Sequence, residues 1–368
     1  MEMKKSKVLF SSVLFDRYDA DVTLPAKFKR LLSVLGDEMG LFRAAEGKNT
    51  VIKMHVGRNI GYSTIHPLFV KILIDSLLKY KANVYITDQD INDAKVRGYT
   101  EEYLGVPVVP VCGVTGKYIY KKKVEFKTLR HVDIGGNVHD ADVFIDLSHV
   151  KGHGGCGFGG GCKNIAMGCV TDRTRREIHS LEGGINWDED LCTHCEACIG
   201  SCNHNVNKFD EQDRYHIFYH HCTYCQHCIK VCPTGALSLD MTGRYEDFQT
   251  GMAVCTEEVL KVFKPENIFF INFLLNITAI CDCWGLTTPA LVPDIGVMAG
   301  TDLVAVEKAC IDAIKVENLI SSGIPQGFKL KEDGHLFDRL HGKNPFVQLR
   351  ELSERGLGNM EYEIAEVG

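Results

Sequence analysis

The fold is decided by residues 142–169, which read DVFIDLSHVKGHGGCGFGGGCKNIAMGC. Asp142 to Leu147 is an apolar run of the kind that forms a buried strand. It leads into Gly152–Gly161, with seven glycines in ten positions, and then into Cys162–Cys169, which can open a helix. A strand, a glycine loop and a helix in this order present backbone N–H groups to an anion, or let a cofactor approach the main chain closely. The segment therefore predicts one strand-to-helix unit of an α/β fold, with a functional loop at its centre.

Apolar runs and amphipathic stretches alternate on both sides of this segment, which is typical of a mixed or parallel sheet with flanking helices. Strands are expected at Val8–Phe15, Val51–Val56, Val84–Thr87, Ile268–Leu275 and Ala290–Val297. Helices are expected at Phe28–Leu41, Pro67–Lys79, Phe248–Phe263 and Asp302–Val316, the last capped by Thr301, and a helix and a strand follow between Pro345 and Ala365. The pattern predicts an α/β body made of residues 1–183 and 242–368.

The size and charge of the chain exclude several classes of protein. A chain of 368 residues exceeds the roughly 250–300 residues of a single core, so at least two folding units are expected. With 45% hydrophobic residues and a net charge of -7, the chain is neither disordered nor a general nucleic-acid binder. No apolar run reaches the ~18–20 residues of a membrane span, and no signal peptide is evident. We expect a cytoplasmic protein, because many unpaired thiols require a reducing compartment.

Eight of the 16 cysteines fall between positions 192 and 232, in two C-x2-C-x2-C-x3-C runs offset by thirty residues. In such runs three thiolates hold one 4Fe-4S cluster and the fourth cysteine binds the other cluster. One predicted 4Fe-4S cluster therefore has the ligands Cys192, Cys195, Cys198 and Cys232. The other predicted 4Fe-4S cluster has the ligands Cys222, Cys225, Cys228 and Cys202. Zinc is the alternative, but a tetrahedral ion does not need the third and fourth cysteines of each run.

These runs lie in residues 184–241, which show neither long helical nor long strand periodicity. The stretch carries eight acidic and three basic residues, a net charge of -5. We interpret it as a small α+β ferredoxin-like dicluster domain inserted into the α/β body. Its six histidines are expected near the clusters rather than as ligands, because His ligation belongs to another cluster type.

The glycine loop is a second candidate site, although it matches neither a P-loop nor a dinucleotide fingerprint. Polar donors crowd around it, and Lys151 and Lys163 are the candidates for holding an anionic substrate or cofactor. The candidate catalytic residues are Lys163, Asn164, His153 and Asp294. The alternative is an ordinary mobile surface loop.

Cys169, Cys281 and Cys283 are candidates for a third metal or redox site. Cys169 follows the glycine loop, and CDCW at 281–284 follows the apolar run at 268–280, so both lie where α/β sheets bind ligands. The alternative is that these are buried thiols, since free cysteine packs as a small hydrophobe.

The sequence resembles the family called domain of unknown function 362, in its Fe-S center protein branch. The resemblance covers most of the chain and is carried by Asp146–Cys169, the dicluster insert, CDCW at 281–284 and DIGVMAGTDLVAVEKA at 294–309. Relatives commonly read Asp-Pro-Val-Ala-Ile-Asp where this chain has Asp302–Glu307, so Glu307 replaces an aspartate. The resemblance implies iron-sulfur content and anaerobic lineages, and it implies no agreed reaction.

Two functional hypotheses follow. The first is an electron-transfer protein: a ferredoxin-like relay, or an oxidoreductase subunit in anaerobic metabolism, that passes electrons to a redox partner protein or a small-molecule acceptor. If the chain is an enzyme, it is an iron-sulfur oxidoreductase. The second is a non-redox enzyme or ligand-binding protein that acts at the Gly152–Cys169 loop, with structural clusters. The sequence leaves the oligomeric state open.

Overall fold

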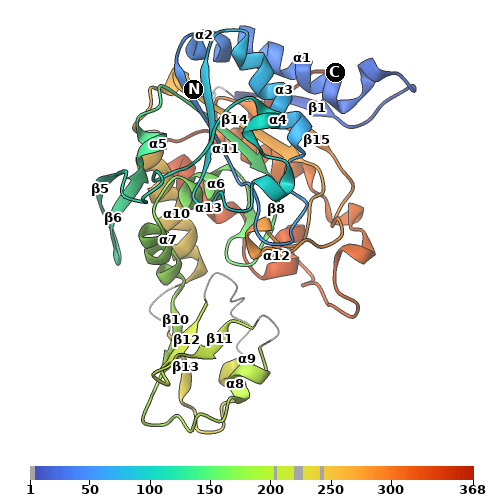
Figure 1. The fold of residues 1–368 in the computed structure, drawn as a ribbon. Helices are drawn as coiled ribbons and strands as arrows, with labels where there is room; N and C mark the ends of the chain where they lie inside the picture. Colours follow the sequence, from blue (N-terminus) through green and yellow to red (C-terminus); the bar gives the residue numbers. More distant parts are fainter. Residues whose placement is uncertain (1–4, 203–204, 219–226, 241–243) are drawn as a thin grey trace.

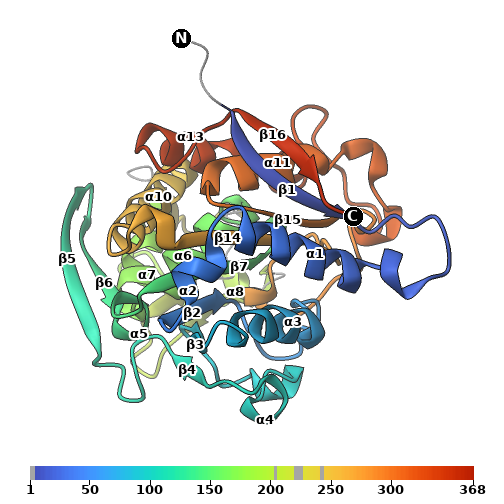
Figure 2. The ribbon, with the colours of Figure 1, turned by 90° about the horizontal axis from the view of Figure 1, so that it is seen from above.

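The central element of the protein is a mixed sheet. The computed structural model describes residues 5–202, 205–218, 227–240 and 244–368, and within them eight strands form this sheet (Figures 1 and 2). In sheet order the strands are β16 (Tyr362–Glu366), β1 (Ser6–Ser12), β15 (Gly296–Gly300), β14 (Ile268–Leu274), β7 (Val143–His149), β2 (Asn49–Met54), β3 (Asn83–Asp88) and β4 (Val108–Pro110). The predicted α/β fold with flanking helices is confirmed.

Strand direction gives this sheet one functional edge. Strands β14, β7, β2, β3 and β4 pair in parallel, whereas β15 is antiparallel to both of its neighbours. The carboxyl ends of β14, β7, β2 and β3 therefore meet at the same edge. In open α/β sheets ligands bind at this edge.

Helices cover both faces of the sheet, because its strands bury side chains on both sides. In β2, for example, Val51 packs into one core and Ile52 into the other. One face carries α1 (Leu24–Asp37), α2 (Leu41–Ala45), α3 (Pro67–Leu78) and α4 (Glu101–Leu104). The other carries α5 (Gly136–His139), α6 (Gly161–Gly168), α7 (Asp172–His179), α10 (Tyr245–Leu260), α11 (Leu303–Ala313), α12 (Leu336–His341) and α13 (Phe346–Glu354). Within the described residues, no helix combines the length and the apolar character needed to cross a bilayer.

Two sequence predictions near the end of the sheet are wrong in detail. The strand expected at Ala290–Val297 begins only at Gly296, because Pro293 lacks an N–H and the exposed Asp294 accepts a hydrogen bond from the N–H of Asn276 instead. The cap of α11 is Asp302 and not Thr301, since the Asp302 carboxylate accepts the N–H of Ala305 at 2.9 Å. The hairpin of β5 (Ile119–Phe126) and β6 (Leu129–Gly135) was not predicted either.

The glycine-rich segment is buried throughout, so the alternative of a mobile surface loop is wrong. It forms a short hairpin of β8 (Lys151–His153) and β9 (Gly157–Gly159), and α6 follows directly. Every residue from 151 to 170 is buried. Glycine is required by close packing: a methyl group at Gly160 would overlap the Glu307 carboxylate, and one at Gly168 would overlap the Lys53 side chain.

The cysteine-rich stretch forms a smaller unit at the lower end of the molecule in Figure 1. Its elements are β10 (Gly184–Trp187), α8 (Ala197–Gly200), β11 (Asn207–Phe209), β12 (Tyr215–Ile217), α9 (His227–Lys230) and β13 (Leu237–Asp240). Helices α8 and α9 begin thirty residues apart, as do β11 and β13, so the cysteine repeat is also a structural repeat. Strand β10 pairs with β13 and β11 with β12, both antiparallel, and Ile185, Leu237, Cys198 and Cys228 form a small separate core.

One carboxylate of the main core is buried against the start of α6. The Glu307 side chain of α11 is 0% exposed. Burial raises the pKa of Glu307 to about 8, and the neighbouring Asp146 carboxyl adds to this rise. Burial likewise raises the pKa of Asp146 to about 6. In the unfolded chain Glu307 loses its proton near 4.5, so between pH 4.5 and 8 the folded state binds more protons and its stability falls as the pH rises.

We therefore expect Glu307→Gln to stabilise the protein at pH 7, by on the order of 3 kcal/mol, because the unfolded glutamate is ionised at this pH and must take up a proton on folding, whereas the amide need not. The gain should vanish well below pH 4.5, where the carboxyl of Glu307 is neutral in both the folded and the unfolded state. Urea unfolding measured at several pH values checks this. Glu317→Gln, at an exposed glutamate after α11, is the matched control and should change neither stability nor its pH dependence. A Glu307→Gln variant that is less stable than the parent at pH 7 would contradict the assignment.

Candidate functional site

A cavity of about 690 Å³, including its open mouth, lies at the carboxyl edge of β2, β3 and β7. Its lining is rich in positive side chains, with histidines and two thiols between them. These residues are Lys53, Arg58, Lys151, Lys163, Arg175, His55, His149, Cys281 and Cys283. The lining also includes Asp88 and Asp90, and the excess of positive side chains over these two acids favours an anionic ligand.

The floor of the cavity contains a buried ion pair. The Lys53 ammonium, 0% exposed, lies 3.0 Å from Asp88 Oδ1 and donates to Asn164 Oδ1 at 2.6 Å. His55 Nδ1 lies 2.9 Å from the other Asp88 oxygen. Despite its burial, the pKa of Asp88 is held well below its usual range by Lys53 and His55. Asn164 donates in turn to Asp146 Oδ1 at 2.8 Å, so α6 is joined to the ends of both β2 and β7.

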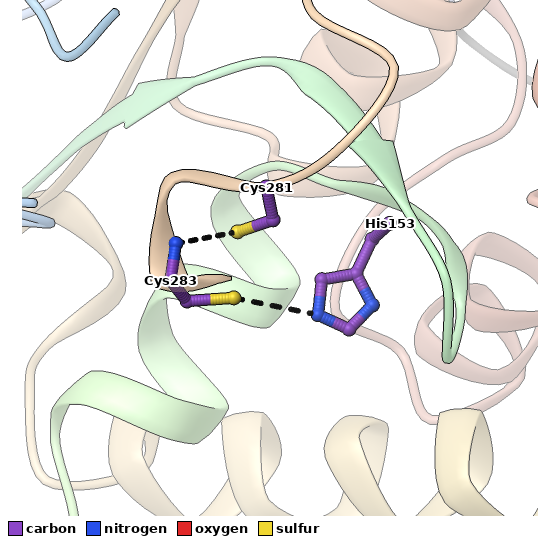
Figure 3. A group of neighbouring side chains, drawn as sticks. All are labelled: His153, Cys281 and Cys283. Carbon is purple, nitrogen blue, oxygen red and sulfur yellow. Dashed lines mark hydrogen bonds between the residues drawn. The ribbon is translucent and has the colours of Figure 1, made fainter. Parts of the chain in front are cut away.

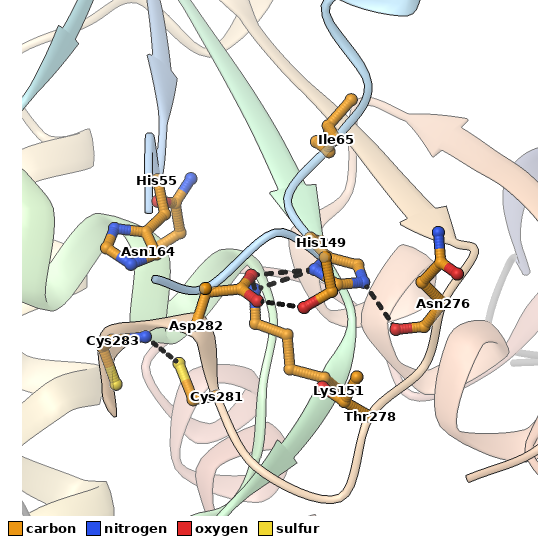
Figure 4. Close-up of polar contacts among 12 residues, drawn as sticks. His55, Ile65, His149, Lys151, Asn164, Asn276, Thr278, Cys281, Asp282 and Cys283 are labelled. Carbon is orange, nitrogen blue, oxygen red and sulfur yellow. Dashed lines mark hydrogen bonds and ion pairs between the residues drawn. The ribbon is translucent and has the colours of Figure 1, made fainter. Parts of the chain in front are cut away.

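A second buried network surrounds Asp282, the acidic residue between the two cysteines of CDCW (Figure 4). Its Oδ2 accepts from Lys151 Nζ at 2.6 Å and lies 2.9 Å from His149 Nδ1, while Ser63 Oγ donates to Oδ1 at 2.6 Å. His149 Nε2 lies 2.7 Å from the Leu275 carbonyl. Burial alone would raise the pKa of Asp282, but Lys151 and His149 lower it well below the usual range. Lys151 is thus engaged by Asp282 and anchors the CDCW turn to β7 and β8.

Cys281 and Cys283 flank this aspartate and meet His153 of β8 (Figure 3). The two sulfurs and a ring nitrogen of His153 lie within 4.8 Å of one another, and all three residues are buried. Cys283 Sγ is 3.8 Å from His153 Nε2, the Cys283 N–H donates to Cys281 Sγ at 3.4 Å, and Lys163 Nζ lies 3.4 Å from Cys281 Sγ.

The three groups differ in their proton affinity. Burial alone would raise the pKa of Cys283, but Cys281 and the Lys163 ammonium lower it to about 6. Burial and Cys283 raise the pKa of Cys281 to about 12. Burial lowers the pKa of His153 to about 3, so its ring is neutral at pH 7. The two thiols therefore act as one coupled pair, and the nearby Lys163 ammonium favours a single negative charge on it.

Three of the four predicted catalytic candidates come together here, and one does not. Lys163 and Asn164 line the cavity, and His153 contacts the thiols behind it. Asp294 lies on an exposed loop outside the cavity. Of the predicted third metal set, Cys281 and Cys283 are adjacent, whereas Cys169 lies at the end of α6 and is not part of their group.

Sequence reasoning missed Lys53, Asp88 and Asp282. The sequence feature that could have revealed them is a charged residue among apolar neighbours. Lys53 lies within the apolar run of β2, and Asp282 lies between two cysteines. Such groups are buried only when they are paired.

In the cysteine-rich unit, one cavity of about 330 Å³ is lined by Cys192, Cys195, Cys198 and Cys232, together with Trp187, Phe209 and Tyr215. Three thiols from one run and one thiol from the other thus face the same space, with an apolar wall behind them. Four converging thiols fit the ligand set of a 4Fe-4S cluster. Cys195 is exposed and Cys198 is buried. Of the other predicted set, Cys202 and Cys228 are described, while Cys222 and Cys225 lie outside the described residues.

Comparison with known proteins gave one family and a small number of distant structures. The family described as Domain of unknown function (DUF362) matches residues 50–312. The lactate racemase apoprotein from Thermoanaerobacterium thermosaccharolyticum is similar at 14% identity with a TM-score of 0.41, over 78% of this chain and 55% of that chain. A protein from Thermotoga maritima is similar at 12% identity with a TM-score of 0.41, over 80% of this chain and 60% of that chain. The chain thus spans less than two thirds of either structure, and no curated protein matches it.

The buried pair in the cavity floor generates a stability prediction. Lys53→Met should lower the free energy of unfolding by about 3–5 kcal/mol, because it leaves the Asp88 carboxylate buried without its cation. The double change Lys53→Met with Asp88→Asn should cost less than the single change. Urea unfolding at pH 7 measures both. Lys123→Met, at an exposed lysine of β5, is the control and should stay within about 0.5 kcal/mol of the parent. Equal losses for the single and the double variant would contradict the pairing.

Proposed function

This chain belongs to the family described as Domain of unknown function (DUF362), and from that premise we propose that it is an iron-sulfur protein that transfers electrons through two 4Fe-4S clusters. The observation that carries the proposal is the convergence of Cys192, Cys195 and Cys198 with Cys232 around one cavity. Cys232 is forty residues from Cys192 in sequence, so the chain's own fold brings the fourth thiol from the second run. When bound, such a cluster accepts and donates single electrons.

The remaining cysteines of the proposed pair are Cys202, Cys222, Cys225 and Cys228. Support for a second centre comes from the thirty-residue repeat, in which α9 of the second half corresponds to α8 of the first. Cys198 and Cys228 occupy the same position in these two helices, and both are buried in the small core. An equivalent backbone supports an equivalent ligand set.

We further propose that residues 184–241 form an inserted domain, and that residues 1–183 and 242–368 form the body. The chain enters this stretch at β10 and leaves it at β13, and the register pairs Gly184 with Asp240. Adjacent entry and exit points are what an insertion requires, since the body can then continue on either side without distortion.

The charge of this domain supports docking to a basic partner. Asp188, Glu189, Asp190 and Glu196 are exposed, and they surround the exposed Cys195 in sequence. An acidic rim beside the most exposed ligand attracts a positively charged redox protein and brings it close to the donor. A small-molecule acceptor would not need this rim.

The body cavity favours a second candidate function. A non-redox enzyme or ligand-binding protein would act at the Gly152–Cys169 segment, with clusters that only stabilise the insert. The buried ammonium of Lys163 facing the cavity is the observation behind it. If both sites cooperate, the chain is an iron-sulfur oxidoreductase.

The first test is an anaerobic iron and sulfide determination with dithionite titration and EPR. We expect about eight irons, about eight sulfides and two reducible centres. Cys232→Ala should remove or alter one centre and leave the other, since one thiol of the first set is missing. Cys112→Ala, at a buried thiol of the body, is the control and should leave both.

About eight irons that cannot be reduced would reject electron transfer and favour the second function. Zinc in place of iron in protein prepared without oxygen would reject both centres.

The acidic rim gives a separate prediction. Electron transfer to a basic acceptor protein should slow steeply as salt rises from about 0.05 to 0.5 M, because the attraction is screened. A variant with Asp188→Asn, Glu189→Gln and Asp190→Asn should be several-fold slower at low salt and nearly insensitive to salt. Stopped-flow kinetics measures both. Transfer to a neutral dye is the control and should not change. An unchanged salt dependence would show that another surface docks the partner.

A further inference from the structure

The thiol group in the α/β body takes no part in the proposed electron transfer. Its donors come from two segments that are far apart in sequence: His153 lies on β8, and Cys281 and Cys283 flank Asp282 on the turn after β14. The three side chains are at most 4% exposed, and their donor atoms all lie within 4.8 Å of one another. The Lys151 and Ser63 hydrogen bonds to Asp282 fix the turn from which the two sulfurs project.

We propose that His153 Nε2, Cys281 Sγ and Cys283 Sγ bind one divalent metal ion of the zinc type, with a fourth position open to the cavity. A tetrahedral ion with ligands at about 2.0–2.3 Å keeps those ligands about 3.3–3.8 Å apart. The distance of 3.8 Å between Cys283 Sγ and His153 Nε2 already meets this requirement. Thiolate and imidazole donors together select zinc over magnesium or calcium.

The surrounding groups match such an ion in charge. Two thiolates neutralise a divalent cation, so the centre itself is neutral. The N–H of Cys283 donates to Cys281 Sγ at 3.4 Å, and the Lys163 ammonium lies 3.4 Å from the same sulfur. Such outer contacts orient a thiolate ligand and tune it. Because the ion balances the sulfurs, the charge of Lys163 is left for a ligand in the cavity.

The fourth position is expected to be open because the described chain supplies only three donors to this group. Three protein ligands and an open position are typical of catalytic zinc, whereas structural zinc has four protein ligands. Cys281 and Cys283 both line the cavity, as does Arg58, whose guanidinium has no ion pair among the described residues. His55 Nε2, which also lines the cavity, is buried without a hydrogen-bond partner in the described part of the chain. We infer that the fourth ligand is water or an anionic substrate.

Binding through Nε2 requires the ring proton of His153 to lie on Nδ1. Cys156 Sγ lies 3.3 Å from Nδ1 and can accept a hydrogen bond from the Nδ1–H group. Cys156 is therefore a positioning residue for the His153 ring. In the structure the Gly155 N–H donates to Nδ1 at 3.1 Å, so zinc binding through Nε2 requires this hydrogen bond to be given up. Without a metal ion the ring can instead donate from Nε2 to Cys283 Sγ, 3.8 Å away.

The test uses the full-length protein, purified without oxygen, reduced, and incubated with excess zinc before chelating resin removes loosely bound metal. Elemental analysis should give about one zinc per chain beside the cluster iron. The zinc-edge absorption spectrum, to which iron does not contribute, should fit two sulfurs at about 2.3 Å and one or two lighter atoms at about 2.0–2.1 Å. Cys283→Ser and His153→Gln should each reduce zinc at least tenfold, with the iron content unchanged.

Two matched controls separate this ligand set from other thiols. Cys169→Ser and Cys112→Ser change buried cysteines of the same body and should keep the zinc. Wild-type protein that takes up no zinc, or a Cys283→Ser protein that binds it as the parent does, would overturn the proposal. So would a disulfide between Cys281 and Cys283 that persists after reduction. If the variants do not fold, the wild-type spectrum decides: four sulfurs would mean that zinc lies on the cysteines of the 184–241 stretch. Because iron is counted separately, failure here leaves the electron-transfer proposal untouched.

Discussion

Buried charge at the carboxyl edge of the sheet is the constraint on which the other features of this protein depend. Lys53, Asp88, Lys151 and Asp282 are all nearly inaccessible, and each cation faces a carboxylate at 3.0 Å or less. Removing such groups from water costs several kcal/mol per ion, so each is tolerated only while its partner stays in place. The pairs therefore fix the ends of β2, β3, β7 and the CDCW turn relative to one another. Because each ammonium is paired with a carboxylate, these four residues position the cavity wall without adding net charge to it.

The glycine-rich segment follows from the same constraint. Helix α6 must approach the sheet edge closely enough for Asn164 to accept from Lys53 and donate to Asp146. A side chain at Gly160 or Gly168 would occupy the space of Glu307 or Lys53, so glycine is needed for contact and not for flexibility. The loop remains a predicted ligand site, and its physical role differs from that of a phosphate loop. Its residues pack against the core, and the side chains of Lys163 and Asn164 reach the cavity.

The sequence predicted the layers of the fold well because burial leaves a clear hydrophobic pattern in strands such as Ile268–Leu274. The predicted bounds were wrong where local backbone chemistry overrides the hydrophobic pattern. After Pro293, strand β15 begins only at Gly296, and Asp302 rather than Thr301 caps α11. Ion pairs between distant residues could not be read from it, since Lys53 and Asp88 are thirty-five positions apart and on different strands. The same limit explains Cys169, which lies near the glycine loop in sequence but at the far end of α6 from the thiol group. His153, one of the candidate catalytic residues, lies beside Cys283, a contact that the sequence does not reveal because the two residues are 130 positions apart.

The thiols of this chain fall into two environments that suit different chemistry. In the cysteine-rich unit, repeated short segments bring four thiols to one cavity, and one of these cysteines is exposed. In the body, burial raises the pKa of Cys156, Cys162, Cys169 and Cys255. These four thiols are fully buried and pack as small hydrophobic side chains. Only Cys283, among the body thiols with a described shift, has a lowered pKa. Cys281 and Cys283 also differ from the core thiols in position, because both line the cavity and their sulfurs lie with a ring nitrogen of His153 within 4.8 Å of one another, so the proposed metal ion would be bound here.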